Sequence, residues 1–167
     1  MSGDLSLDTD DVAELEASLR RRFRTVETPV EVAPRTFTIL HPANADDLIT
    51  EADYVRDERL PYWADLWPSA TILAARMLAG AGRGRSLIEL GCGAGLVVSA
   101  AAVAGFDVVA SDYYADALQF ARVNANRNSG RDIAVRGARR SAVGAAARER
   151  DHGPAVNTVL AMTTVLA

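Results

Sequence analysis

Apolar residues recur at helical spacing near the start of the chain. Residues 8–24 place apolar side chains on one side of a helix, at Val12, Leu15, Leu19 and Phe23. Asp8, Thr9 or Asp10 is suited to cap this helix, and the acids that follow are stabilised by the positive end of the helix dipole. We therefore predict a helix over 8–24 that packs on the rest of the protein.

The pattern then changes to that of a strand and a second helix. Residues 30–42 alternate apolar and polar side chains and end at a proline, which predicts a strand or an irregular hairpin. After a polar, turn-rich stretch, a proline follows Trp67, as is typical at the start of a helix. The helix is predicted to begin at Pro68, to place apolar residues on one side and to end at glycine, as marked by Ile72, Leu73, Met77, Leu78, Gly80 and Gly82.

Residues 86–128 alternate between strand and helix patterns. The segments 86–90 and 106–112 are short and nearly all apolar, as in strands that are buried on both faces of a parallel sheet. The segments 96–105 and 114–128 have helical patterns, and in the second of these the residues expected to face inward are Ala117, Leu118, Ala121 and Ala125. This order predicts an α/β fold with a parallel sheet and right-handed crossovers.

Composition and charge narrow the class of protein. The 167 residues are 49% hydrophobic and 24% charged, which fits a soluble globular protein with one core. The net charge of -4 predicts no nucleic-acid partner and no membrane-surface partner. The single cysteine, Cys92, excludes an internal disulfide and a cysteine-rich zinc site, and we predict no metal. An acidic N-terminus and the lack of a long apolar run predict a cytoplasmic protein.

The sequence LIELGCGAGLVV at 87–98 places Gly91, Gly93 and Gly95 between a predicted strand and a predicted helix. Such a loop presents backbone N–H groups at the positive end of the helix dipole, and glycine lets a ligand approach the backbone. Ligands of open parallel sheets bind at the carboxyl ends of the strands, where this loop lies. Dinucleotides require G-x-G-x-x-G, and here the third glycine comes one position early.

Two acids next to the loop favour another ligand. Glu89 precedes the glycines, and Asp112 ends the next predicted strand. A carboxylate at the first position suits the sulfonium and ammonium groups of S-adenosylmethionine and would be unhelpful beside a pyrophosphate. A carboxylate at the second position can accept hydrogen bonds from two ribose hydroxyls. The alternative is a tight turn that serves only the fold.

Residues 60–128, from LPYWADLWPSA to RVNANRN, resemble the seven-β-strand S-adenosylmethionine-dependent methyltransferases. They are most similar to the branch of protein-lysine methyltransferases that includes the electron-transfer-flavoprotein β-subunit enzyme and nicotinamide N-methyltransferase-like relatives. With FTILHP upstream, the similarity covers about residues 22–130. It implies a Rossmann-like parallel sheet with flanking helices, an N-terminal helical and β extension over 1–59, and a cofactor-binding methyltransferase domain over 60–167.

The resemblance also implies roles for the residues that match. Glu89 and the glycines Gly91, Gly93 and Gly95 match the motif that holds the amino acid part and the ribose of S-adenosylmethionine. Asp112 matches the acid that binds the ribose.

Aromatic residues match less specifically. Tyr113 stands where a side chain commonly lies against the adenine, and Trp67 matches a tryptophan that caps the cofactor. Trp67 is equally well explained as an anchor for the helix that it precedes. Tyr62 and Trp63 are expected to be structural, although both could line the mouth of the site.

The remaining nucleophiles and bases give no catalytic residue. Cys92 is expected to be a small residue of the loop and not a nucleophile, because no histidine is placed to serve it. His41 and His152 are expected to be packing or surface residues. Methyl transfer from a sulfonium needs mainly positioning of a deprotonated acceptor and exclusion of water, so a catalytic base is not required.

The composition changes after about residue 130. Residues 131–167 contain no aromatic residue and are rich in alanine and arginine, and strands near 132–136 and 156–161 fit the pattern without being required by it. The resemblance implies an acid and aromatic residues after the fourth strand, which this tail lacks. We therefore expect a sheet that is incomplete in its C-terminal half, as from a truncated or frameshifted reading frame.

Together these features predict a methyltransferase that uses S-adenosylmethionine to methylate an amine nitrogen. The expected acceptor is a protein lysine or a small amine. The alternative is a cofactor-binding remnant without catalytic activity. An oxidoreductase that uses a nicotinamide dinucleotide is disfavoured by the glycine spacing.

Overall fold

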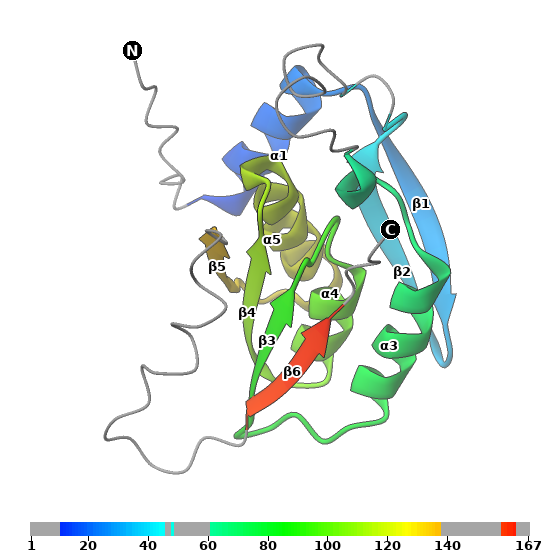
Figure 1. Ribbon diagram of the computed structural model, residues 1–167, viewed down its shortest axis with the longest axis vertical. Coiled ribbons are helices and arrows are strands. Elements are labelled where there is room, and N and C mark those ends of the chain that lie inside the picture. Colours follow the sequence, from blue (N-terminus) through cyan, green and yellow to red (C-terminus); the bar gives the residue numbers. More distant parts are fainter. Residues whose placement is uncertain (1–10, 46–47, 49–60, 138–157, 163–167) are drawn as a thin grey trace.

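The computed structural model describes residues 11–45, 48, 61–137 and 158–162, the last range by its backbone only. The described part is a layered α/β structure (Figure 1). A parallel sheet forms one layer, helices cover one of its faces, and an antiparallel hairpin lies on the far side of those helices. The α/β class and the parallel sheet predicted from the sequence are confirmed.

The sheet has the strand order β5-β4-β3-β6, and each strand is parallel to its neighbour. Its strands are β3 (Ser86–Leu90), β4 (Asp107–Asp112), β5 (Ala134–Gly137) and β6 (Thr158–Met162). Both strands of the atypical tail therefore exist, each beginning two residues later than predicted. Because the chain passes from β3 to β4 and β5 on one side and to β6 on the other, the strand order reverses at β3. In open parallel sheets such a reversal is where ligands bind.

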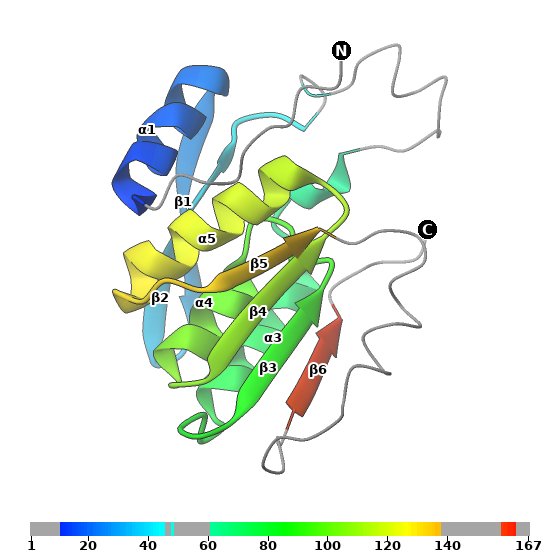
Figure 2. The same cartoon turned by 90° about the vertical axis from the view of Figure 1, so that its left-hand side faces the viewer.

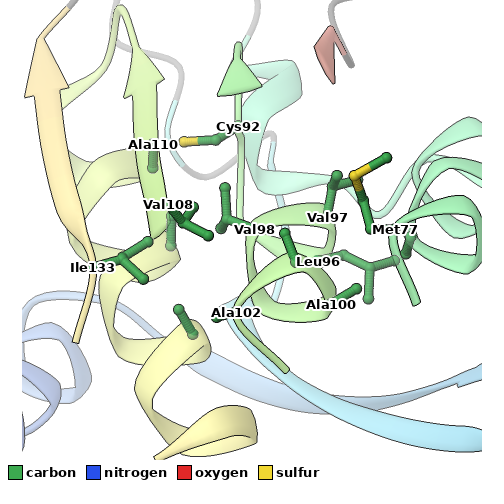
Figure 3. Packing of buried hydrophobic residues seen from close by; sticks show 14 of the residues in the cluster. Met77, Cys92, Leu96, Val97, Val98, Ala100, Ala102, Val108, Ala110 and Ile133 are labelled. Atoms are coloured by element: carbon green, nitrogen blue, oxygen red, sulfur yellow. The ribbon is translucent and has the colours of Figure 1, made fainter. Parts of the chain in front are cut away.

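Helix α4 (Leu96–Val103) lies between the sheet and the hairpin, and every residue from Leu96 to Ala102 is buried. Around it pack side chains of the neighbouring elements, including Met77, Val108 and Ile133 (Figure 3). Its small side chains allow both layers to approach the helix closely, as close packing requires. Helix α5 (Ala115–Ser129) lies beside α4, and it buries the four residues that were expected to face inward: Ala117, Leu118, Ala121 and Ala125.

The prediction of burial on both faces holds at the end of β4, where the consecutive residues Ala110 and Ser111 are both buried, but it was wrong for β3. Leu87 and Glu89 of β3 are buried, whereas Ile88 and Leu90 are only half-buried. In Figure 2 the sheet faces the viewer, and helices α3 and α4 lie behind it. The alternation arises because, within the described residues, helices cover one face of the sheet.

Helix α3 (Pro68–Leu78) begins at Pro68 as predicted. Its buried residues are Ala74 and Met77, with Leu73 and Leu78 packed at the edge of the core. Ile72 was predicted to face the same side and is instead 75% exposed. The reason is geometric: α3 packs against α4 and β1 with the side that carries Ala74 and Met77, and Ile72 lies outside that buried stripe.

The N-terminal part forms a helix and a hairpin. Helix α1 (Val12–Arg22) is capped by the side chain of Asp11, which accepts a hydrogen bond from the backbone N–H of Ala13 at 2.8 Å. The prediction of Asp8, Thr9 or Asp10 as the cap was therefore wrong, and those residues lie outside the described range. Strands β1 (Thr25–Val32) and β2 (Arg35–Pro42) pair antiparallel, which confirms the hairpin alternative.

This N-terminal part shares its core with the residues that follow. Leu15, Leu19 and Leu40 form one buried cluster with Trp63 and Phe120. Above this cluster, Glu16 and Glu27 alternate with Arg20 and Arg127 in a ring of ion pairs that joins α1, β1 and α5, with 2.7 Å from Arg20 to Glu16 and 2.8 Å from Arg127 to Glu27. Such partly exposed pairs contribute little to stability, so the buried cluster is the main attachment.

Some predictions lie outside the described residues. They concern His152 and most of the tail over 131–167. Among the helices that are described, none combines the length and the apolar character that crossing a bilayer requires.

Candidate functional site

The glycine loop, residues 91–95, joins the carboxyl end of β3 to the start of α4. The N–H groups of Gly91 and Cys92 both donate to the carbonyl of Ser111 on β4, at 2.8 and 3.0 Å. The loop then closes a turn, in which Gly95 N–H donates to the Cys92 carbonyl at 3.0 Å. The loop is thus fixed to the end of the neighbouring strand before the helix begins.

Each of the three glycines occupies the left-handed region of backbone space, where a side chain is strained. The φ angles are 70° at Gly91, 53° at Gly93 and 89° at Gly95. A Cβ on Gly95 would lie 2.5 Å from Cα of Ala121, which is shorter than any normal contact. A Cβ on Gly93 would lie 3.1 Å from the carbonyl oxygen of Trp63. The backbone therefore favours glycine at all three positions, and at Gly95 the approach of α5 leaves no room for a side chain, whatever ligand the loop binds.

The two acids predicted from the sequence lie at the ends of neighbouring strands. Glu89 is the penultimate residue of β3 and is fully buried, and Asp112 is the last residue of β4 and is 6% exposed. The register pairs Leu90 with Ser111, so Asp112 lies beside the first residue of the glycine loop. Asp112 Oδ2 accepts from Gly93 N–H and Oδ1 from Tyr114 N–H, each at 3.0 Å.

The thiol of Cys92 is affected by the burial and the negative charges of this site. Burial raises the pKa of its thiol well above the ordinary range, and the negative charges of Glu89 and Asp112 raise it further. Cys92 is therefore a protonated thiol in the core, packed near Ala110 (Figure 3). This supports its assignment as a loop residue that is not a nucleophile, because only a thiolate reacts readily.

The fixed charges of the site suit a ligand with positive charge and hydroxyl donors. Two carboxylates flank the loop. An ionised carboxylate accepts hydrogen bonds and cannot donate them. The two oxygens of Asp112 offer about four acceptor positions, more than the backbone N–H groups of Gly93, Tyr113 and Tyr114 use. S-adenosylmethionine, which carries a sulfonium, an ammonium and two ribose hydroxyls, fits this set of acceptors.

A dinucleotide fits less well. Its pyrophosphate would bind the free N–H groups of the first turn of the helix. In α4 that turn consists of Leu96, Val97 and Val98, which are 3%, 0% and 0% exposed. The turn is covered by neighbouring elements, and the two nearby carboxylates would repel the phosphates.

The aromatic residues separate into exposed and buried groups. Tyr113 is 52% exposed beside Asp112, and its ring meets the Tyr114 ring edge-on with centroids 5.2 Å apart. Trp63 is buried against Phe120 at a centroid distance of 5.7 Å, in agreement with a structural role. Trp67 is the residue before α3, half-buried, and its indole N–H donates to the Tyr62 carbonyl at 3.0 Å. Trp67 thus has the position of a helix anchor, and its role as a cofactor cap stays a prediction.

Histidine 41 has a packing role as well. Its Nε2 lies 2.8 Å from Oγ1 of Thr28 across the hairpin. Burial lowers the pKa of His41, which favours the neutral imidazole in the folded protein.

The sequence analysis missed one residue that contacts the loop. Asn124 on α5 is fully buried and donates from Nδ2 to the carbonyl of Ala94 at 2.8 Å. A signal was present, because Asn124 follows Ala121 at helical spacing and so falls within the buried stripe of α5. A polar residue in such a stripe needs partners, which made it a candidate for a positioning role.

Comparison with known proteins gives no assignment: no protein-family model and no curated protein matches the chain. Within the described residues, no three side chains of the histidine, cysteine, aspartate and glutamate types gather as a metal site.

The burial of Asp112 is expected to make the free energy of unfolding depend on pH. Burial raises its pKa above the ordinary range, although the N–H groups of Tyr114 and Gly93 act in the opposite direction. The folded state then holds the proton more tightly than the unfolded chain, so the stability contribution of Asp112 rises as the pH falls through its folded pKa and levels off below its unfolded pKa. As the pH is lowered through this range, we expect the free energy of unfolding of the wild type to rise relative to that of Asp112→Asn. Urea denaturation at a series of pH values measures the difference, and a constant difference would contradict the prediction.

Proposed function

We propose that this chain is an S-adenosylmethionine-dependent methyltransferase that methylates an amine nitrogen, with a protein lysine as the favoured acceptor. The observation that carries the proposal is the position of Glu89 and Asp112, two buried carboxylates at neighbouring strand ends on either side of one glycine loop. A cationic ligand with vicinal hydroxyls is the best match to that arrangement. We propose further that the protein acts in the cytoplasm.

The strand order supports the proposal. Numbered along the chain within the sheet, the parallel strands lie in the order 3-2-1-4. The first four strands of a doubly wound, Rossmann-like sheet have this order, and its ligands bind where the order reverses. The glycine loop follows β3, the strand at the reversal.

Each residue of the site has a proposed task. Asp112 would accept hydrogen bonds from the ribose hydroxyls, and Glu89 would provide negative charge near the amino acid part. The backbone at Gly91 and Gly93, which is partly exposed, would line the ligand. The exposed ring of Tyr113 would lie against the adenine, with Trp67 as a candidate cap. When bound, S-adenosylmethionine supplies an activated methyl group on its sulfonium, so the chain needs to position the acceptor amine and exclude water.

A second function is favoured by the sheet face that the described helices leave uncovered. Ile88 and Leu90 on that face are half-buried. A chain with one sheet face uncovered could bind the cofactor without forming a complete site for the acceptor. We therefore keep a cofactor-binding module without transferase activity as the alternative.

Calorimetry distinguishes these proposals. We expect the wild type to bind S-adenosylmethionine and S-adenosylhomocysteine and to bind NAD more weakly. Asp112→Ala is expected to lose at least about tenfold in affinity, because one hydrogen bond to a charged group contributes roughly 1.5 to 3 kcal/mol. Unchanged affinity in that variant would exclude the proposed site. Incubation with labelled S-adenosylmethionine and lysine-rich protein acceptors then separates a transferase from a binding module.

A further inference from the structure

Two asparagines of α5 bind the free side of β2. Asn124 Oδ1 accepts from Leu40 N–H at 2.8 Å, and its Nδ2 donates to the Leu40 carbonyl at 2.7 Å. Asn128, one turn later, makes the same pair of bonds with Thr38, both at 3.1 Å. Thr38 and Leu40 are two residues apart on one strand, so their backbone groups point to the same side. The two carboxamides thus pair with β2 as a neighbouring strand would.

Only one of the two carboxamides also reaches the glycine loop. The Nδ2 of Asn124 has a second partner, the carbonyl of Ala94, at 2.8 Å. Ala94 stands between Gly93 and Gly95, and its carbonyl is fixed by this bond from α5. The second partner of Asn128 Nδ2 is the Asn124 carbonyl of its own helix, at 2.8 Å.

The burial of Asn124 makes the loss of its hydrogen bonds costly. The side chain is fully buried, so water cannot replace the partners that it would lose. Its three hydrogen bonds join the hairpin, α5 and the loop in one network. A fully satisfied buried network of this kind makes the parts that it joins rigid, because breaking one bond leaves a buried polar group without compensation.

We propose that Asn124 is a positioning residue that couples the β1–β2 hairpin to the glycine loop, so that order in the hairpin sets order in the ligand site. Coupling is reciprocal, so a ligand on the loop stabilises the hairpin to the same extent. The ligand part of this inference rests on the proposed function, whereas the coupling of loop and hairpin does not.

Hydrogen exchange of the wild-type protein tests the coupling without a ligand. We expect the amide of Leu40 to open together with the loop amides of Cys92 and Gly95, with the same opening free energy and the same denaturant dependence. The amide of Thr38, which is held by Asn128, is the internal control and is expected to exchange faster than that of Leu40. An amide of Leu40 that follows Thr38 and not the loop would overturn the proposal.

A matched pair of variants tests the role of the side chain. Asn124→Ala and Asn128→Ala each remove one carboxamide from β2, but only the first removes the bond to Ala94. At equal global stability, set by urea, we expect loop exchange to accelerate about tenfold in Asn124→Ala, the loss of one buried hydrogen bond, and not in Asn128→Ala. Equal acceleration in both variants would contradict the proposal. If Asn124→Ala does not fold, the wild-type measurement decides.

A third measurement uses the ligand. With saturating S-adenosylhomocysteine, we expect exchange at Leu40 to slow more than exchange at Thr38. Absence of any binding to the wild type would count against the proposed function. The coupling would then be judged from the two ligand-free exchange experiments. Binding that slows Leu40 and Thr38 equally would overturn the coupling and leave the proposed function intact.

Discussion

Gly95→Ala is expected to lower the free energy of unfolding by about 2 to 5 kcal/mol, as the combined result of a strained backbone and an overpacked contact. Gly95 has φ of 89°, a conformation that costs an alanine side chain energy. Its new Cβ would also lie 2.5 Å from Cα of Ala121 and 2.8 Å from Cβ of that residue, so α5 would have to move away from α4. Because small domains are stable by only about 5 to 15 kcal/mol, much of the expressed variant is expected to be insoluble or unfolded.

Gly130→Ala separates the two causes. Gly130 has φ of 70°, but nothing lies within 4 Å of the position where its Cβ would stand. This variant therefore has the backbone strain alone and is expected to lose only about 1 kcal/mol. Urea denaturation of both variants gives the comparison, and equal losses would mean that the approach of Ala121 to Gly95 is not as close as described.

Glu89→Gln is expected to weaken binding of S-adenosylhomocysteine by about 10- to 100-fold, because it removes a charged hydrogen-bond acceptor. The substitution keeps the size of the side chain, so the packing of β3 is retained. Glu89 is fully buried, and removal of a buried charge lowers a desolvation cost, so stability is expected to hold or to rise. Affinity would thus fall without a loss of stability, which a purely structural role does not explain. Calorimetry and thermal denaturation measure the two quantities.

Asp107→Asn is the matched control for Glu89→Gln. Asp107 begins β4 at the opposite end of the sheet and is exposed, so this variant removes the same charge far from the loop. We expect its affinity for S-adenosylhomocysteine to equal that of the wild type. A loss of affinity in Asp107→Asn would show that net charge is responsible, and full affinity in Glu89→Gln would remove Glu89 from the site.

The order of strands and helices was predictable because it depends on local patterns. The structure has the predicted order of strand, helix and strand over 86–112. It also buries the four residues that share one side of α5: Ala117, Leu118, Ala121 and Ala125. The errors concern properties that depend on neighbours. Ile72 has a good pattern for burial, but no described element covers it. Leu90 was expected to be buried, but the described helices cover the other face of its strand.

The candidate site was predictable in part for the same reason. The glycine loop and the acids Glu89 and Asp112 are recognisable from spacing alone, since each stands at the end of a strand. The reason for Gly95 was not, because it depends on how closely α5 approaches α4. The bond from Asn124 to Ala94 joins residues 30 positions apart, and no local pattern encodes such a contact.

The sequence by itself determined most of the elements, their order and the chemistry at the strand ends, because hydrophobic period and residue type act over a few neighbouring positions. Only the tertiary structure decided which faces are covered, why Gly95 must have no side chain, and which polar group of α5 holds the loop. These properties depend on distances between elements that are far apart along the chain. The physical reason is that packing and burial are set by the surfaces that meet, and a sequence pattern gives one surface at a time.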